Sequence, residues 1–453
     1  MNFTIIAKQD GRSIKLNYDN MTNVVTGADL IPLNPLWKDP RVGERTNNAE
    51  NSFTPNSNTN KVKRYLSTLD ITLGLNCNFD CGYCSQRPVA GKGYSAKPSD
   101  VEPFMQMLER NGIEVKPDGW VNLWGGEPLL YWKTIKVLLP RLRAKMPTQR
   151  FEIITNGSLL TKEKIDFFCQ HRVVVSVSDD GQNEFRGKAA YESAKKQDEL
   201  YEYAAKTMGD LFFLGVVPSK GNANVIKIID TIRKRVPSIK RIYTDNVLKC
   251  YTTEDRDGVP ARLLYRMTDD DLIALHDSRF VDCMVMRHNG DKSQGTFRLA
   301  LAAGVPEVER AQCGIATGNM LCVNLRGDIF SCHAFAAKGD EFGHLDDLDN
   351  AVIRNHTSSD NRPMCKECLL YSLCRGDCSR LSDEAHVISC ENRYASLYPR
   401  FREVFSSTFG VWVDAVEPQG PQSRVMQLLN YRNPTMADVR SAPIKKKIPI
   451  IQE

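Results

Sequence analysis

Three cysteines constrain the fold of this chain more than any other feature. Cys77, Cys81 and Cys84 directly follow an apolar segment, residues 69–75, that is typical of a buried strand. On a tight loop, thiolates at this spacing can hold three irons of a [4Fe-4S] cluster and leave the fourth iron without a protein ligand. A zinc site is the alternative, because Cys-x2-Cys alone is a common zinc motif. No fourth Cys or His lies close by in the sequence, however, and an aromatic residue, Tyr83, precedes the last cysteine, so we favour the iron–sulfur cluster.

The same residues resemble the hallmark Cys-x3-Cys-x-aromatic-Cys of the radical S-adenosylmethionine (SAM) enzymes. This resemblance implies that Cys77, Cys81 and Cys84 ligate a [4Fe-4S] cluster and that Tyr83 belongs to the SAM site. In that family the open iron chelates the amino and carboxylate groups of SAM, and reduction gives a 5′-deoxyadenosyl radical that abstracts hydrogen from the substrate. The cofactor supplies the chemistry, and the protein supplies orientation and shelter.

Length and composition indicate a globular protein of two or three domains, with 453 residues and 42% apolar content. No segment has the 18 or so consecutive apolar residues that a membrane helix needs, and the N-terminus carries no cleavage signal. We therefore expect a cytoplasmic protein with no membrane partner. The 14 cysteines are too sparse for a secreted disulfide scaffold and are expected to be mainly metal ligands. A net charge of +5, from 60 basic and 55 acidic residues, gives no reason to expect a nucleic-acid partner.

Apolar strand-like segments alternate with helical segments over residues 66–248. The strands are expected at residues 69–75, 120–124, 150–155, 172–178, 211–217 and 239–245, and the helices at residues 99–110, 131–145, 161–171, 189–208 and 222–235. Six such units predict parallel strands with right-handed crossovers, which form an open or partial barrel. Catalytic residues of such barrels lie at the C-terminal ends of the strands, and the three-cysteine loop falls there.

Eight more cysteines lie in the last third of the chain, too many for a single four-ligand site: Cys313, Cys322, Cys332, Cys365, Cys368, Cys374, Cys378 and Cys390. Spacing alone leaves structural zinc sites open as an alternative. The array is similar to the SPASM domain, a C-terminal extension of one branch of radical SAM enzymes that holds two auxiliary [4Fe-4S] clusters. By order along the chain, the resemblance assigns Cys313, Cys322, Cys332 and Cys378 to one cluster, and Cys365, Cys368, Cys374 and Cys390 to the other.

The predicted fold class is α/β, with a partial (β/α)6 barrel followed by a small loop-rich SPASM domain that holds two iron–sulfur clusters. An Asp10-Gly11 turn predicts an N-terminal hairpin, and Thr268 with Asp271 predicts a capped helix start. The expected domains are the hairpin with an Asn-rich linker (residues 1–65), the radical SAM barrel (66–248), a bridging region (249–311), the SPASM domain (312–391), and C-terminal helices with a tail (392–453).

Short polar motifs at the ends of predicted strands complete the expected SAM site. Gly125-Gly126-Glu127-Pro128 follows the second strand, where glycines let the backbone approach a ligand and a carboxylate can bind an ammonium group. In radical SAM enzymes this segment binds the amino group of SAM. The resemblance adds four SAM contacts from the ends of the third and fourth strands: Thr155, Asn156, Ser178 and Arg186.

SPASM enzymes mostly modify peptides or proteins. The resemblance therefore implies an oxidoreductase that modifies a ribosomally made peptide, forming a carbon–carbon or thioether crosslink at an unactivated side-chain carbon. The alternatives are oxidation of an alcohol or thiol on a sulfatase or small molecule, and a metal-binding protein without turnover. In sulfatase maturases an Asp that serves as base directly follows the Cys aligned with Cys332. Here that position is His333, a candidate catalytic base near neutral pH.

The same resemblance implies the cofactors and partners. The cofactors are three [4Fe-4S] clusters and SAM. The partners are the precursor peptide, a separate leader-peptide-binding protein, and an electron donor such as flavodoxin or ferredoxin. The N-terminal segment lacks the helical periodicity of the winged-helix module with which some peptide-modifying relatives grip a leader.

Overall fold

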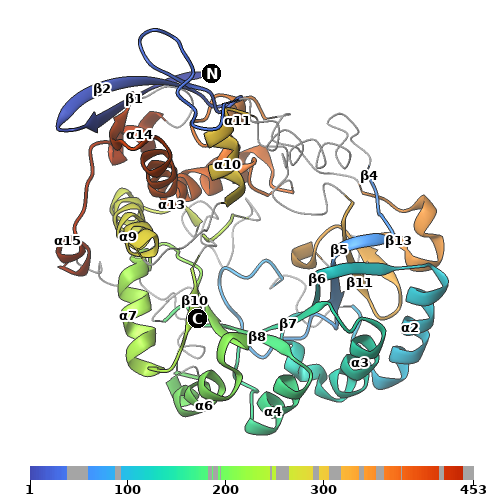
Figure 1. The fold of residues 1–453 in the computed structure, drawn as a ribbon. Coiled ribbons are helices and arrows are strands. Elements are labelled where there is room, and N and C mark those ends of the chain that lie inside the picture. The colour runs from blue at the N-terminus through green and yellow to red at the C-terminus, as the bar shows by residue number, and fades with distance from the viewer. Residues whose placement is uncertain are drawn as a thin grey trace.

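The structure, a computed structural model, describes residues 1–37, 60–86, 93–181, 186, 192–193, 195–244, 247–250, 265–288, 295–305, 318–335, 341–353, 362–378, 380–417 and 423–441. Within these residues the largest element is a sheet with the strand order β10-β9-β8-β7-β6-β5-β11-β12-β13 (Figure 1). Six consecutive strands of this sheet are parallel: β5 (Tyr65–Thr72), β6 (Glu114–Trp124), β7 (Arg150–Thr155), β8 (Val173–Ser178), β9 (Phe212–Gly215) and β10 (Arg241–Tyr243). The predicted partial (β/α) barrel is confirmed.

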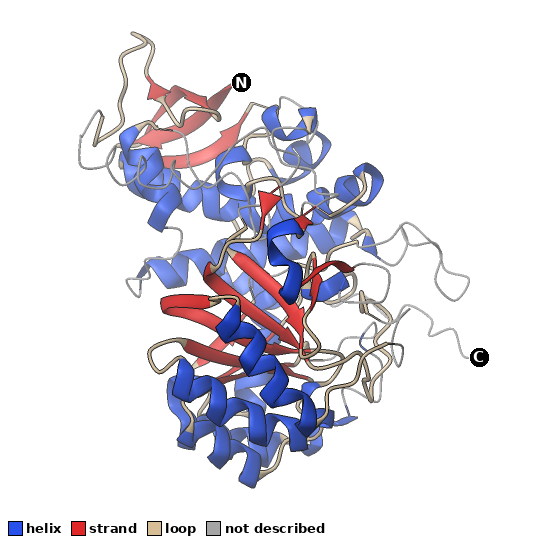
Figure 2. Ribbon diagram, turned by 90° about the vertical axis from the view of Figure 1, so that its right-hand side faces the viewer, coloured by secondary structure: helices blue, strands red, loops and turns tan. Residues whose placement is uncertain are grey.

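Helices cover the outer face of this parallel sheet and leave the inner face concave (Figures 1 and 2). They are α2 (Val101–Arg110), α3 (Trp132–Lys145), α4 (Lys162–Gln170), α6 (Asp198–Met208) and α7 (Val225–Arg235). Side chains alternate along a strand, so Leu69 and Ile71 of β5 are buried against the helices, whereas Asp70 and Thr72 lie on the concave face. Polar residues on that face are the first structural sign of a binding site.

Several predicted boundaries differ from the structure, two of them by more than five residues. β6 begins at Glu114 rather than at residue 120, because its first residues pair with Tyr65 and Leu66 of β5 across a register shift. Pro117 and Gly119 hide this extension in the sequence, since both residues are unfavourable in strand interiors. α6 begins at Asp198, and most of residues 182–194, where the helix was expected to start, lie outside the described residues.

The C-terminal region extends the barrel sheet. β11 (Met320–Asn324) pairs in parallel with β5, and β12 (Asp328–Phe330) and β13 (Glu341–His344) follow as antiparallel strands. A short pair, β4 (Asn60–Lys61) and β14 (Val352–Ile353), lies beside it. The cysteines of β11 and of the turn after β12 are therefore neighbours of the barrel strand that leads into the three-cysteine loop.

A second unit combines the first strands of the chain with elements from residues 269–441 (Figure 1, top and left). The predicted hairpin is present as β1 (Asn2–Gln9) and β2 (Arg12–Asp19), and it forms a sheet with β3 (Val25–Thr26) and the C-terminal β15 (Trp412–Val416). The helices here are α9 (Asp269–His288), which starts with the predicted Thr268–Asp271 cap, α10 (Gly295–Ala303), α13 (Asp383–Phe409), α14 (Ser423–Leu429) and α15 (Met436–Ser441). The proposed domain boundaries stay a prediction.

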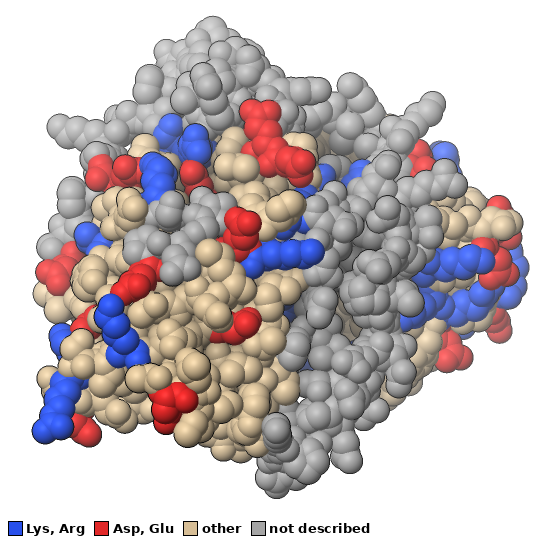
Figure 3. All heavy atoms as spheres, turned by 90° about the horizontal axis from the view of Figure 1, so that it is seen from above, with Lys and Arg blue, Asp and Glu red and all other residues tan. Residues whose placement is uncertain are grey.

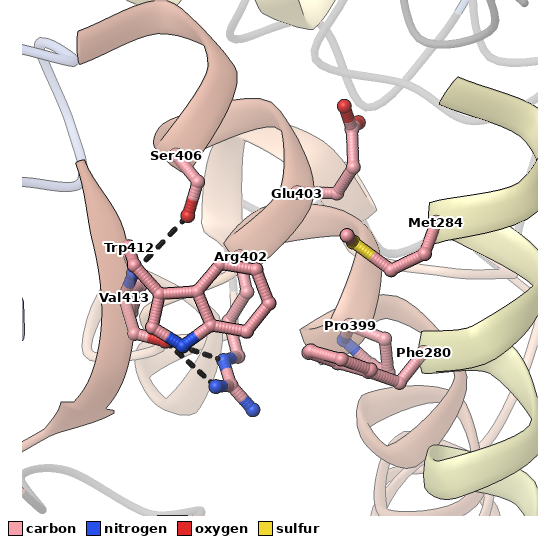
Figure 4. Close-up of a pocket in the computed structure, with 8 residues that line it drawn as sticks. All are labelled: Phe280, Met284, Pro399, Arg402, Glu403, Ser406, Trp412 and Val413. Carbon is pink, nitrogen blue, oxygen red and sulfur yellow. Dashed lines mark hydrogen bonds between the residues drawn. The ribbon is translucent and has the colours of Figure 1, made fainter. Parts of the chain in front are cut away.

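Arg402 of α13 connects α13 to β15 and to the segment after α14 through hydrogen bonds. Its guanidinium is fully buried and donates to Val413 O from Nη2 (2.6 Å) and to Arg432 O from Nη1 (2.7 Å). Figure 4 shows the small cavity beside it, between α9, α13 and β15. With a volume of about 10 Å³ it has room for one water molecule at most, so it is no ligand site.

The surface mixes charges. On the face in Figure 3, basic and acidic side chains of the described residues lie interspersed. Exposed ion pairs such as Arg64–Asp349 (2.8 Å) occur elsewhere on the described surface, and each contributes little to stability. Among the described helices, none is both long and apolar enough to cross a membrane.

Candidate active site

The three-cysteine loop starts where β5 ends and is held by the segment that follows β6. Gly126 N donates to Gly74 O (2.9 Å), and Glu127 N donates to Asn76 O (2.8 Å). A Cβ on Gly126 would lie 2.4 Å from Asn76 O, and one on Gly125 would lie 2.5 Å from Gly74 O. The two glycines are required here because any side chain would push the two segments apart.

The three thiols of this loop lie within electrostatic range of one another. Burial, and then the charges of Cys84 and Cys77, raise the pKa of the Cys81 thiol to about 11 against the opposing charge of Arg186. Burial likewise raises the pKa of Cys77, and Cys84 adds to this. No three His, Cys, Asp or Glu side chains of the described residues converge closely enough for a single metal ion. An iron–sulfur cube, which takes one thiolate per iron, spaces its thiolates more widely than a single zinc ion does.

Glu127 locks the ends of two neighbouring strands together. Its buried carboxylate accepts three hydrogen bonds, from Thr155 Oγ1 (2.6 Å), Asn156 N (2.7 Å) and Leu129 N (2.9 Å). Pro128 begins the turn that Glu127 caps. A carboxylate can accept about four hydrogen bonds, so a ligand amino group would have to share these oxygens. The SAM contacts expected of Glu127 and Thr155 stay predictions beside this locking role.

The other expected SAM residues gather at the end of β8. Ser178 is the last residue of β8, and two residues later Asp180 accepts a hydrogen bond from Tyr83 OH. Arg186 Nη1 lies 3.5 Å from the same carboxylate oxygen of Asp180. Arg186 is only 8% exposed, and its Nη1 donates no hydrogen bond within the described residues. Such a buried, incompletely satisfied guanidinium beside Cys81 suits an anionic ligand.

A row of polar side chains crosses the concave face below the loop. Asp70 of β5, Asn122 of β6 and Glu152 of β7 are paired in register. Asp70 accepts from Asn122 Nδ2 (2.8 Å) and contacts His333 Nδ1 (2.9 Å). The His333 ring also packs against the Trp124 ring, with 3.9 Å between ring centroids and an angle of 41° between the ring planes. His333, the expected base, is thus held inside the barrel mouth.

Asn122 and Glu152 are the other two members of this row. Asn122 Oδ1 is buried and accepts no hydrogen bond in the described part of the chain. Burial, and then the charge of Asp70, raise the pKa of Glu152 to about 7. Neither residue was anticipated from the sequence. The available signal was a polar residue in the middle of an apolar strand segment, as in Val121-Asn122-Leu123 and Phe151-Glu152-Ile153.

The four cysteines of one expected quartet lie within electrostatic range of one another. Cys365 lies in α11 (Pro363–Lys366), and Cys374 is the last residue of α12 (Tyr371–Cys374). Cys368 lies between these two helices. Burial, and then the charges of Cys368, Cys374 and Cys365, raise the pKa of Cys390 on α13. The charges of these four thiols thus influence one another, and their assignment to one cluster stays a prediction.

The members of the other expected quartet come from separate elements. Cys322 lies on β11 with its Sγ 3.9 Å from Thr72 Oγ1, and Cys332 follows β12. Cys378 packs on an apolar group that also contacts Tyr83. Cys313 lies outside the described residues. A cavity of about 340 Å³, lined by Thr72 and by Phe330, the strand partner of Cys322, opens beside this region.

Comparisons with known proteins agree with this geometry. Residues 71–243 match the protein-family model described as the Radical SAM superfamily. A cysteine-type anaerobic sulfatase-maturating enzyme of Clostridium perfringens (strain 13 / Type A) is 23% identical over 373 residues, which are 75% of this chain and 95% of that enzyme. The radical SAM cyclopropyl synthase TigE of Paramaledivibacter caminithermalis is 24% identical over 139 residues, 26% of this chain and 28% of that enzyme.

A solved structure shares the fold. Native anSMEcpe with bound AdoMet and Cp18Cys peptide superposes with a TM-score of 0.54 at 16% identity, covering 76% of this chain and 99% of that chain. At this identity the likeness shows a common fold, and it extends well beyond the barrel into the C-terminal region.

Proposed function

This chain belongs to the radical SAM superfamily, and we propose that it oxidatively modifies a ribosomally made peptide, forming a carbon–carbon or thioether crosslink at an unactivated side-chain carbon. The position of the three-cysteine loop carries the proposal, because the loop is locked at the mouth of a concave sheet face whose inward side chains are polar. When bound, the [4Fe-4S] cluster and SAM supply a 5′-deoxyadenosyl radical that abstracts hydrogen.

The chain's own residues bind and orient these groups. Cys77, Cys81 and Cys84 hold the cluster, and the unsatisfied donor of Arg186 supports a role in binding the carboxylate of SAM. The remaining SAM contacts are assigned to residues that line the same loop and strand ends: Tyr83, Gly125, Gly126, Glu127, Pro128, Thr155, Asn156 and Ser178.

Two auxiliary [4Fe-4S] clusters complete the cofactor set. The convergence of Cys365, Cys368, Cys374 and Cys390 supports the first of them. The second is assigned to Cys322, Cys332 and Cys378 together with Cys313. Four thiolates each would leave no auxiliary iron open, which favours electron transfer over direct binding of substrate.

Crosslinking removes two hydrogens from the peptide. One leaves as a hydrogen atom, and the other leaves as a proton and an electron. Glu152 is suited to accept the proton, because a carboxylate with a pKa near 7 is an efficient base at neutral pH. The electron passes to an external acceptor, and a separate donor protein such as flavodoxin or ferredoxin supplies the electron that the cleavage of SAM consumes. His333 beside Asp70 stays the candidate predicted from the sequence.

Co-expression with a candidate precursor peptide tests the proposal. We expect the peptide to lose the mass of two hydrogens when a short precursor encoded beside this chain is co-expressed with it, together with any separate leader-peptide-binding protein. The Cys77→Ala/Cys81→Ala/Cys84→Ala variant should leave the peptide mass unchanged. An unchanged mass with the active chain would contradict crosslinking.

Sulfatase maturation is the second candidate, because the curated relative from Clostridium perfringens matches along 95% of its length. A synthetic peptide with a central cysteine separates the two functions. Conversion of that cysteine to formylglycine, together with an unmodified precursor peptide, would favour this candidate. Crosslinking without formylglycine formation would exclude it.

A further inference from the structure

The N-terminal hairpin reaches the loop that carries three cysteines of the quartet Cys365, Cys368, Cys374 and Cys390. Asn20, in the turn after β2, is fully buried. Its side-chain Nδ2 donates to Cys368 O (2.7 Å) and to Lys366 O (2.9 Å). Its backbone carbonyl oxygen accepts from Ser372 Oγ (3.0 Å). Both donors of the Asn20 amide are therefore used on the loop between Cys365 and Cys374.

This loop has little structure of its own to keep its shape. α11 and α12 are four residues each, far too short to be stable without tertiary contacts. Their connecting residues pack into the core of the N-terminal sheet, where Cys368 and Leu369 lie in one cluster with Phe3 and Tyr18. The shape of the cysteine loop thus depends on a hairpin more than 300 residues earlier in the chain.

We propose that Asn20 is a positioning residue for the auxiliary cluster held by Cys365, Cys368, Cys374 and Cys390. The N-terminal hairpin then contributes to the shape of this metal site. Asn20 fixes the carbonyl of Lys366, inside the Cys365–Cys368 turn, and the carbonyl of Cys368 at its end, which sets the spacing of the two thiolates. The inference rests on the proposed function, because it takes the auxiliary cluster as its premise.

Asn23 supplies a matched control within the same turn. It is also fully buried, and it accepts from Tyr18 OH (2.8 Å) and donates to Val305 O (2.9 Å). None of these partners belongs to the cysteine loop. Replacing either asparagine by aspartate keeps the volume and buries a charge in the same hairpin. The N-terminal ammonium of Met1 donates to Asn20 Oδ1 (2.8 Å) and would offset the charge at position 20 only, so a general cost of burial should fall no more heavily on Asn20→Asp than on Asn23→Asp.

The experiment compares full-length chains purified without oxygen: the unchanged chain, Asn20→Asp, Asn23→Asp and Cys368→Ala. Iron and sulfide content and the electron paramagnetic resonance spectrum after reduction are measured. We expect Asn20→Asp and Cys368→Ala to lose about four irons per chain, the content of one cluster, together with the same component of the spectrum. Asn23→Asp should keep both. Formation of 5′-deoxyadenosine should persist in Asn20→Asp, because the first cluster is untouched.

Each other outcome is decisive. Full iron and an unchanged spectrum in Asn20→Asp would overturn the inference, and so would equal losses in Asn20→Asp and Asn23→Asp. If Asn20→Asp does not fold, the uncharged pair Asn20→Ala and Asn23→Ala gives the same comparison. About four irons in the unchanged chain would instead refute the auxiliary clusters themselves, which is a failure of the proposed function.

Discussion

At the scale of single residues, Glu152 gives the clearest electrostatic prediction. Its pKa is raised from 4.5 to about 7, so the folded protein binds the proton more tightly than the unfolded chain does. The stability that this carboxyl contributes is complete below pH 4.5 and falls as the pH rises through the window from 4.5 to 7. Glu152→Gln should remove this fall, so that the variant gains up to about 3 kcal/mol over the unchanged chain between pH 4.5 and pH 8. Urea unfolding of both proteins at several pH values measures this difference in the free energy of unfolding.

Glu109→Gln on the exposed face of α2 is the control for that series, since it removes a carboxylate from the surface. Parallel pH curves for Glu152→Gln and the unchanged chain would show that Glu152 is not perturbed by its surroundings.

Glu127 gives a second prediction at this scale. Glu127→Gln turns one acceptor oxygen into a donor that faces Asn156 N in one orientation of the amide and Leu129 N in the other. We expect a loss of about 1–3 kcal/mol in the free energy of unfolding, because a buried donor is left without an acceptor, and weaker binding of SAM. Equilibrium dialysis with SAM and urea unfolding measure the two effects. Unchanged stability would mean that the carboxylate does not lock the strands.

At the scale of elements, the contact between the cysteine loop and the segment after β6 is the decisive one. Gly126→Ala would place a Cβ 2.4 Å from the backbone oxygen of Asn76, so the loop must move. We expect the loss of about four irons per chain and of 5′-deoxyadenosine formation. Gly27→Ala is the control, because the nearest atom to its Cβ would be an ordinary 3.4 Å away. Full iron in Gly126→Ala would show that the loop tolerates displacement.

At the scale of the whole molecule, two sheets are completed by strands from distant parts of the chain. β11 adds to β5, and β15 adds to β1. These two pairings join strands that are far apart in the sequence, unlike the features that could be predicted. The alternation of apolar segments revealed the six parallel strands, and the polar motifs at their ends revealed the mouth of the barrel, because both signals are local in sequence.

The partners of the edge strands could not be predicted, because tertiary packing decides them. For the same reason the contact of Asn20 with the Cys368 loop was invisible in the sequence. Asp70 and Glu152 were missed because a single polar residue in an apolar strand segment does not reveal what lies opposite. The grouping of Cys365, Cys368, Cys374 and Cys390, by contrast, came from the resemblance and their order along the chain, and the mutual influence of their charges supports it.

Cleavage of SAM under strong reduction is the test on which the rest depends. The chain, purified without oxygen, is mixed with SAM and dithionite, and 5′-deoxyadenosine, iron, sulfide and zinc are quantified. We expect 5′-deoxyadenosine from the unchanged chain, and none from the Cys77→Ala/Cys81→Ala/Cys84→Ala variant, which should lose only about four irons. Zinc in place of iron and sulfide, or equal amounts of 5′-deoxyadenosine from both proteins, would contradict a cluster held by these three cysteines.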